Sequence, residues 1–255
     1  MVNVIYKKKG LKINAIWFSD GKSGDINENK VDFIFFHGVR DNAYKNAIVN
    51  LQYTLITDLE EDLDCIFKKI NKNFRYHINR AKKEDTNCVV FNSDDLMNEP
   101  DLLNNFKKQY AIFTKLKGID NTYNQAAMEK YMENGNVILT KAFKGNEDYA
   151  QHIIICDGIN ARLLYSVSNF RTEGADRNFI GRANKYLHWN DIEYLKNRGF
   201  QQLDWGGISS IVSLNGVDKF KKHFGGMERQ HYNIIEGKSF LGKAAVMAKK
   251  MVGGN

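Results

Sequence analysis

The residues best suited to chemistry gather in the last third of the chain, around a predicted helix over residues 184–198. The segment before this helix, residues 171–183, carries three arginines and two glycines. Backbone N–H groups at a helix N-terminus bind anions, and glycines let an anion approach the backbone closely. An ordinary surface loop is the alternative. On the first interpretation, the anion-binding residues are Arg171, Gly174, Arg177, Gly181, Arg182 and Asn184.

A second group of residues, Asp204-Trp205-Gly206-Gly207, ends a predicted strand over residues 201–205. In mixed α/β sheets, ligands bind beyond strand ends, where neighbouring strands separate or change partner. Asp204 could orient an amine or accept its proton, and the two glycines would let a substrate reach the backbone. We therefore predict Asp204 as catalytic and Trp205, Gly206 and Gly207 as substrate-binding. A capping aspartate followed by turn glycines is the alternative.

Two histidines near these segments could act as bases around neutral pH. His188 lies on the helix after the anion-binding loop, and His223 lies beside Phe224. His188 is taken as the catalytic candidate, with a structural role as the alternative. His152 falls on a predicted strand, where packing in the core is expected.

The elements that must position these residues are interleaved strands and helices, which predicts a mixed α/β fold. Runs of β-branched and aromatic residues predict strands over 31–36, 48–56, 86–91, 137–143, 149–156, 162–167, 201–205 and 229–235. Apolar residues at steps of three and four predict helices over 63–81, 102–113, 123–132, 184–198 and 240–251, with a short one after Asn215. Turns or caps are predicted at Gly38, Asp41-Asn42, Asp157-Gly158, Gly199 and Asn215.

Bulk composition narrows the choice of partners and location. The 255 residues carry a formal net charge of +7, with a pI of about 9.1, which favours anionic partners. Three cysteines, Cys65, Cys88 and Cys156, are too dispersed for a disulfide framework or a zinc site. No signal peptide or membrane span is apparent, so we expect a cytoplasmic protein that does not insert stably into a membrane and holds no metal.

The glycine-rich segments together resemble the GNAT acyltransferases and, within them, the Fem-type peptidoglycan-bridge enzymes. Phe220-Lys221 with Phe224-Gly225-Gly226 matches a Phe-Lys-x-x-Phe-Gly-Gly element of that family without a gap. Arg171-x-x-Gly174 matches the first half of the GNAT pyrophosphate loop, but Asp176 replaces a small residue in the second half. The resemblance is specific in the last third of the chain and faint before it.

The resemblance implies a GNAT-like fold, arranged as two tandem GNAT-like halves over residues 1–95 and 96–255. It implies that residues 171–184 hold the pyrophosphate of coenzyme A. It also implies that Lys221 faces the reaction centre and that Phe220 beside it binds the substrate. There the lysine would stabilise the tetrahedral oxyanion that forms when an amine attacks a carbonyl.

The family offers two donor and acceptor pairs. Fem-type enzymes move an aminoacyl group from tRNA to a peptidoglycan precursor, and many carry a long helical hairpin for the tRNA. No such arm is predicted here, which favours acyl-CoA as donor and the amino group of a nucleotide-linked amino sugar as acceptor, in surface polysaccharide biosynthesis. The aminoacyl-tRNA route is the alternative. In either case we expect direct transfer in a ternary complex, with no cysteine placed to form an acyl-enzyme.

Other classes of function find less support in the sequence. No HExxH, P-loop, GxSxG or post-strand GxGxxG motif occurs, which excludes the common metalloprotease, NTPase, hydrolase and dehydrogenase signatures. A module that only binds nucleic acid would use the basic face of residues 68–83, but the aromatic residues there fall on the apolar face. An inactive GNAT-like scaffold is the third alternative.

Overall fold

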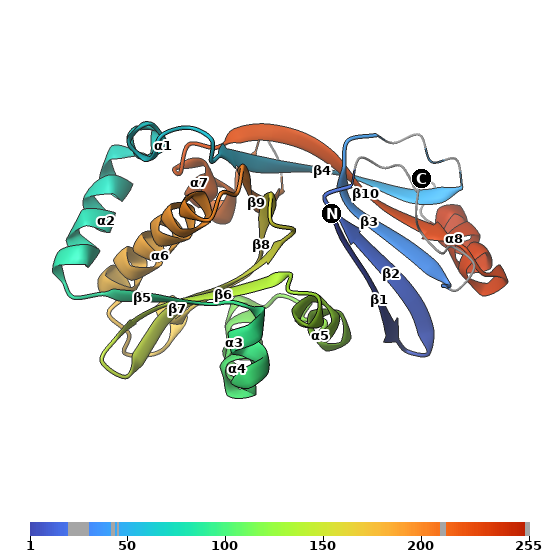
Figure 1. Cartoon of the computed structure of the whole chain (residues 1–255), viewed down its shortest axis with the longest axis horizontal. Coiled ribbons are helices and arrows are strands. Elements are labelled where there is room, and N and C mark those ends of the chain that lie inside the picture. The colour runs from blue at the N-terminus through green and yellow to red at the C-terminus, as the bar shows by residue number, and fades with distance from the viewer. Residues whose placement is uncertain (20–30, 42–43, 45, 210–212, 253–255) are drawn as a thin grey trace.

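The computed structural model describes residues 1–19, 31–41, 44, 46–209 and 213–252, and its ten strands form one mixed sheet (Figure 1). The strand order is β1-β2-β3-β10-β4-β9-β8-β7-β6-β5. The strand bounds are β1 Val2–Lys8, β2 Leu11–Trp17, β3 Phe33–Val39, β4 Ala47–Asp58, β5 Asn87–Phe91, β6 Val137–Lys144, β7 Glu147–Cys156, β8 Asn160–Ser168, β9 Gln202–Ile208 and β10 Met227–Gly237. All neighbours are antiparallel except the parallel pairs β2–β3 and β8–β9.

Helices cover both faces of the β5–β9 region (Figure 1). Two separate cores result, one with α1, α2 and α6 and the other with α3, α4 and α5. The helix bounds are α1 Leu63–Lys69, α2 Lys72–Lys83, α3 Ser93–Asn98, α4 Pro100–Lys117, α5 Gln125–Glu133, α6 Arg177–Asn197, α7 Gly216–Lys222 and α8 Phe240–Val252, with a 3₁₀ turn, η2, at Asn169–Arg171.

Alternation along the strands divides the apolar residues between the two cores. Ile153 and Ile155 of β7 enter the core with α3–α5, whereas Ile154 enters the core with α6. Successive side chains of a strand point to opposite faces, so a strand that is apolar throughout requires cover on both sides. The predicted strands over 137–143, 149–156 and 162–167 and the Asp157-Gly158 hairpin are confirmed.

The sheet opens between β8 and β9. These parallel strands pair with each other only over residues 160–162 and 202–204. Beyond Asp204 they no longer pair with each other. Next to the opening, Trp205 and Gly206 of β9 lie opposite the single residue Leu55 of β4, which is a β-bulge. Gly206 has a φ of 75°, a conformation that glycine adopts without strain.

Several predicted bounds are wrong. The helix predicted over 63–81 is two helices, because Ile70 and Asn71 are extended and Asn71 caps α2. The strand predicted over 86–91 is β5, which begins at Asn87 and is a partly buried strand at the edge of the sheet. The helix predicted from residue 184 begins at Arg177. The strand predicted to end at residue 205 continues to Ile208.

The turn predicted at Gly38 is wrong. Gly38 lies within β3, with a φ of 75°, and its N–H donates to Asn233 Oδ1 at 3.1 Å. The turn predicted at Asp41-Asn42 falls partly outside the described residues, because Asn42 is not among them. The caps at Gly199 and Asn215 are confirmed, since Gly199 has a φ of 83° and Asn215 caps α7.

The sheet is continuous across the predicted boundary at residue 95. β4 of the first range pairs with β9 and β10 of the second, and β5 pairs with β6. The division into two GNAT-like halves stays a prediction. Among the described residues, no helix is both long enough and apolar enough to cross a bilayer.

Candidate functional site

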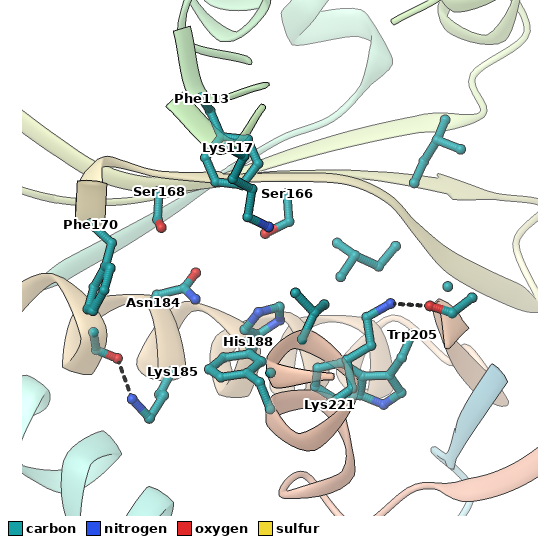
Figure 2. Close-up of a pocket in the computed structure, with 18 of the residues that line it drawn as sticks. Phe113, Lys117, Ser166, Ser168, Phe170, Asn184, Lys185, His188, Trp205 and Lys221 are labelled. Atoms are coloured by element: carbon teal, nitrogen blue, oxygen red, sulfur yellow. Dashed lines mark hydrogen bonds between the residues drawn. The ribbon is translucent and has the colours of Figure 1, made fainter. Parts of the chain in front are cut away.

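A pocket of about 770 Å³ occupies the opening between β8 and β9 (Figure 2). Leu163, Leu164, Ser166 and Ser168 of β8 form one side of it, and Trp205, Gly206 and Gly207 of β9 form another. Residues of α6 and α7 line the rest, with Phe113 and Lys117 at the end of α4. Clefts of this size with a mainly apolar lining and a few convergent polar groups are typical of small-ligand sites.

Trp205, Gly206 and Gly207, which follow Asp204 on β9, form a wall of the pocket at the β-bulge. A Cβ on Gly206 would lie 3.0 Å from the carbonyl oxygen of Leu163, so the position is too confined for a side chain. Trp205 is buried, and its indole N–H donates to Thr57 Oγ1 at 2.8 Å. The structure therefore brings the four residues predicted to bind substrate, Trp205, Gly206, Gly207 and Phe220, to the pocket.

Asp204 is held by an ion pair next to the pocket rather than exposed within it. Its carboxylate accepts hydrogen bonds from the Arg162 guanidinium, from Thr54 Oγ1 and from Gly206 N–H, the last at 2.8 Å. Burial acts to raise the pKa of Asp204, but Arg162 and these donors outweigh it, so the pKa lies below its ordinary value. The contacts suit an anionic anchor for the Gly206 bulge. The proton-accepting role stays a prediction.

Lys221 extends from α7 into the pocket and places a cation beside Gly207 (Figure 2). Its Nζ donates to the Gly207 carbonyl oxygen at 2.8 Å. Burial, and then the positive charge of Arg162, lowers the pKa of Lys221 to about 8. The ammonium is therefore mostly charged at neutral pH, and its remaining N–H bonds are directed by the Gly207 contact.

The residues around Lys221 fix α7 against the sheet. Asn215 caps the helix and forms a capping box with Asp218. Phe224 stacks on Trp205 with ring centres 4.6 Å apart. A Cβ on Gly225 would lie 2.6 Å from the Lys69 carbonyl oxygen, so the Phe-Gly-Gly segment lets α7 approach the end of α1.

His188 reaches the pocket from α6, but its surroundings make it a weak base. The ring is buried among Trp205, Phe220 and Phe224, at centre distances of 5.1 to 5.4 Å. Burial, followed by electrostatic interactions with His152, Lys221 and Lys185, lowers the pKa of His188 well below 6.5. A neutral imidazole can still donate or accept a hydrogen bond. The catalytic role of His188 stays a prediction.

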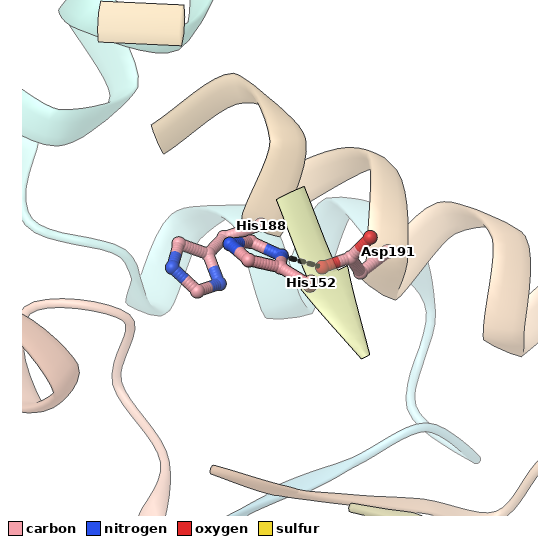
Figure 3. A group of neighbouring side chains, drawn as sticks. All are labelled: His152, His188 and Asp191. Atoms are coloured by element: carbon pink, nitrogen blue, oxygen red, sulfur yellow. Dashed lines mark hydrogen bonds and ion pairs between the residues drawn. The ribbon is translucent and has the colours of Figure 1, made fainter. Parts of the chain in front are cut away.

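Behind His188 lies a buried polar group, His152 and Asp191 (Figure 3). His152 Nδ1 lies 2.6 Å from Asp191 Oδ2, and the His152 ring stacks on His188 at a centre distance of 4.1 Å. Possible ligand atoms of the three residues lie within 4.8 Å of one another. The lone pairs of an imidazole lie in the plane of its ring, so two stacked rings do not direct them toward one shared ion. We therefore interpret the His152–Asp191 pair as a structural support that holds the His188 ring in place.

The structure divides the predicted anion-binding residues into two sets. Arg171, Gly181 and Asn184 line the pocket. Gly174 lines a different hollow, Arg177 is the exposed first residue of α6, and Arg182 forms a bidentate ion pair with Glu84 at 2.7 and 2.8 Å.

The N-terminus of α6 already holds a negative group. The Asp176 side chain caps the helix and accepts from Phe179 N–H at 3.0 Å. Asn184 lies two turns further along the helix, so its side chain rather than its backbone N–H faces the pocket. Binding of pyrophosphate by this segment stays a prediction.

Other polar residues of the pocket were missed from the sequence. Lys117 ends α4, Lys185 lies one turn from His188, and Arg162 pairs with Asp204. Burial, and then the charge of Arg171, lowers the pKa of Lys117. Ser166 and Ser168 alternate with the buried Val167 on β8, and this polar alternation in an apolar strand was the one local signal available.

Comparisons of whole structures place this fold beside proteins of the predicted type. FemX is similar with a TM-score of 0.60 and 13% identity over 91% of this chain and 83% of that one. The C-terminal domain of a lysylphosphatidylglycerol synthetase from Agrobacterium fabrum has a TM-score of 0.57 and 11% identity, over 86% and 72%. L-PGS from Bacillus licheniformis has a TM-score of 0.53 and 12% identity, over 85% and 72%.

No family model and no curated protein matches the sequence itself. At these identities the likeness concerns the fold. The expected mixed α/β fold is confirmed, and it is similar to the fold of FemX.

Proposed function

We propose that this chain is an acyltransferase that moves an aminoacyl group from tRNA to an amine of a cell-wall precursor, in the pocket between β8 and β9. The observation that carries the proposal is Lys221, a cation beside the Gly207 carbonyl at the opening of the sheet. A fold shared with FemX and with two lysylphosphatidylglycerol synthetase structures supports the aminoacyl donor.

The reaction needs little acid–base chemistry from the protein. The acceptor amine, as free base, attacks the ester carbonyl of the donor, so that a C–N bond forms and a tetrahedral oxyanion develops. Lys221 stabilises that oxyanion electrostatically. The C–O bond to the ribose then breaks, the proton of the amine is lost and the ribose hydroxyl gains one. Positioning both substrates in one pocket supplies the remaining rate enhancement.

Positive side chains at the pocket suit a donor that brings phosphates. Lys117, Lys185 and Arg171 all line it. The α6 N-terminus is closed to a pyrophosphate by the Asp176 carboxylate, which weighs against coenzyme A. A tRNA end needs no such diphosphate cradle.

A second candidate is transfer from acyl-CoA to a nucleotide-linked amino sugar. It is favoured by Arg171, Gly181 and Asn184, which line the same pocket as Lys221. This candidate differs from the first in donor and acceptor but uses the same attack on a carbonyl.

A transfer assay with two donor panels tests the proposal. One panel is a pool of charged tRNAs, the other a set of acyl-CoA thioesters, each with a peptidoglycan precursor and with amino-sugar nucleotides, and products are read by mass spectrometry. We expect an amide product from a charged tRNA, lost in Lys221→Met and retained in Lys219→Met, whose lysine is exposed on the same helix. Transfer only from acyl-CoA would select the second candidate. No product from either panel would contradict both.

A further inference from the structure

Helix α8 has an apolar face that the described part of the chain leaves uncovered. Four of its side chains are strongly exposed: Phe240 at 87%, Leu241 at 66%, Met247 at 61% and Met251 at 73%. Gly242 and Val246 are its buried positions. In Figure 1 the helix lies at the outer side of the β3–β10 region, away from the pocket. Exposed apolar patches of this kind mark interaction surfaces.

The exposed apolar residues form one continuous stripe. At 100° per residue, Phe240, Ala244, Met247 and Met251 lie on one line, and Leu241, Ala245 and Ala248 lie beside it, an arc of about 160° in all. Lys243 and Lys250 border this stripe on one side, and Lys249 borders it on the other. All three lysines are exposed. An apolar stripe bordered by lysines is typical of helices that lie in a membrane interface.

Close glycine packing fixes the orientation of the stripe. A Cβ on Gly242 would lie 2.1 Å from the carbonyl oxygen of Asp32, and one on Gly237 would lie 2.4 Å from the Gly242 backbone. The helix therefore rests on β10 by its narrow glycine edge. Gly242 N–H also donates to Ser239 Oγ at 3.1 Å at the start of the helix. The apolar stripe lies on the side of α8 opposite this packed edge and stays exposed, although Phe240, Met247 and Met251 also line an open hollow next to Val31 and Asn46.

The charges and composition decide among the occupants of this surface. Residues 20–30 hold one apolar side chain, Ile26, and so offer little to cover the stripe. A second copy would bring the lysines that border each stripe together. An anionic lipid surface instead suits both the lysines and the apolar stripe. Its headgroups attract the lysines, and the boundary of its acyl chains buries Phe240, Leu241, Met247 and Met251.

We propose that α8 docks this protein on membranes that contain anionic lipid. The helix lies in the plane of the interface, with its stripe buried by about 5–10 Å and without crossing the bilayer. The net charge of +7 favours the approach. The proposal rests on α8 alone and stands apart from the chemistry of the pocket.

Vesicle flotation with the full chain tests the proposal. Vesicles of phosphatidylcholine mixed with phosphatidylglycerol, which gives them a negative surface potential, are compared with vesicles of pure phosphatidylcholine. We expect the protein to float with the anionic vesicles and to be released by salt. Binding should fall at least ten-fold in Leu241→Gln/Met247→Gln, and roughly five-fold for each lysine lost in Lys243→Gln or Lys249→Gln.

A matched control distinguishes binding by the α8 stripe from non-specific binding of exposed apolar residues to vesicles. Ile112→Gln removes an apolar side chain that is 59% exposed on α4, and it should float as the parent does. The substituted positions are exposed, so unchanged thermal melting verifies the fold of each variant. Failure to float at low salt would overturn the proposal, as would equal flotation of the Leu241/Met247 variant. A concentration-dependent dimer that this variant abolishes would also overturn it, by assigning the face to a second copy.

Discussion

At the scale of single residues, the site depends on two partly buried charges of opposite sign near the Gly206 bulge. Asp204 is stabilised as an anion by Arg162 and Thr54, whereas Lys221 is a cation that burial disfavours. A group that costs stability and faces a pocket is typical of functional sites rather than of structural ones.

Lys221→Met should stabilise the protein below pH 8, by on the order of 1 kcal/mol, because the buried ammonium is removed. The folded-state pKa of Lys221 is about 8, against an ordinary value of 10.5. Between pH 8 and pH 10.5 the lysine is protonated in the unfolded chain but largely neutral in the folded one. The free energy of unfolding of the parent therefore rises with pH, and the higher stability of the variant disappears. Urea unfolding at pH 7 and pH 10 measures this. A constant difference at both pH values would contradict the shift.

Asp204→Asn should lower the free energy of unfolding by about 3 kcal/mol, because it leaves the buried Arg162 guanidinium without its carboxylate. The pKa of Asp204 is lowered in the fold, so this contribution is present above pH 4 and is lost as pH falls through the folded-state value. Thermal melting at pH 7 checks the change. Unchanged melting with lost turnover would instead support a proton-accepting role.

At the scale of elements, close backbone approach explains the glycines that carried the family resemblance. The Phe224-Gly225-Gly226 segment lets the end of α7 pass beside the end of α1 and β4, since a Cβ on Gly226 would lie 3.1 Å from the Ile56 carbonyl oxygen. The motif therefore sets the position of α7, and through it the position of Lys221.

Gly225→Ala should destabilise the protein by about 2 kcal/mol, because Gly225 has a φ of 79° and no room for a Cβ. Gly216→Ala, at the start of the same helix, is the matched control, since a Cβ there would meet nothing within 4 Å. Chemical denaturation of both variants gives the comparison. Equal stability of the two would show that α1 and α7 are not in this contact.

The helix caps and turns that were predicted correctly from the sequence are those that depend on neighbouring residues. The caps at Asn215 and Gly199 and the turn at Asp157-Gly158 each depend on residues a few positions apart. The start of α6 was missed because the glycines and arginines suggested a loop, although Asp176 stands three residues before Phe179 as an N-cap does. The Arg162–Asp204 pair joins strands 42 residues apart and leaves no local pattern.

At the scale of the whole molecule, β10 connects the ends of the chain. It lies between β3 and β4, although more than 160 residues separate it from them. This placement could not be predicted from periodicity, because pairing between distant strands depends on the fold as a whole. The overall mixed α/β class could be predicted, since each element has its own pattern.

A chain that ends at Gly226 should fail to fold, because β3 loses its β10 partner and β4 loses one edge. A chain that ends at Lys238 keeps β10, removes α8 and should retain the sheet. Gel filtration and limited proteolysis distinguish the two. A compact, protease-resistant product from the shorter chain would contradict the role given to β10.

The most direct test of the central claim is a crystal structure with a non-hydrolysable aminoacyl-adenosine, which mimics the charged end of tRNA. We expect density in the pocket between β8 and β9, with the aminoacyl carbonyl oxygen within hydrogen-bonding distance of Lys221 Nζ. Density for the analogue at another surface, with the pocket empty and Lys221 still on the Gly207 carbonyl, would contradict it.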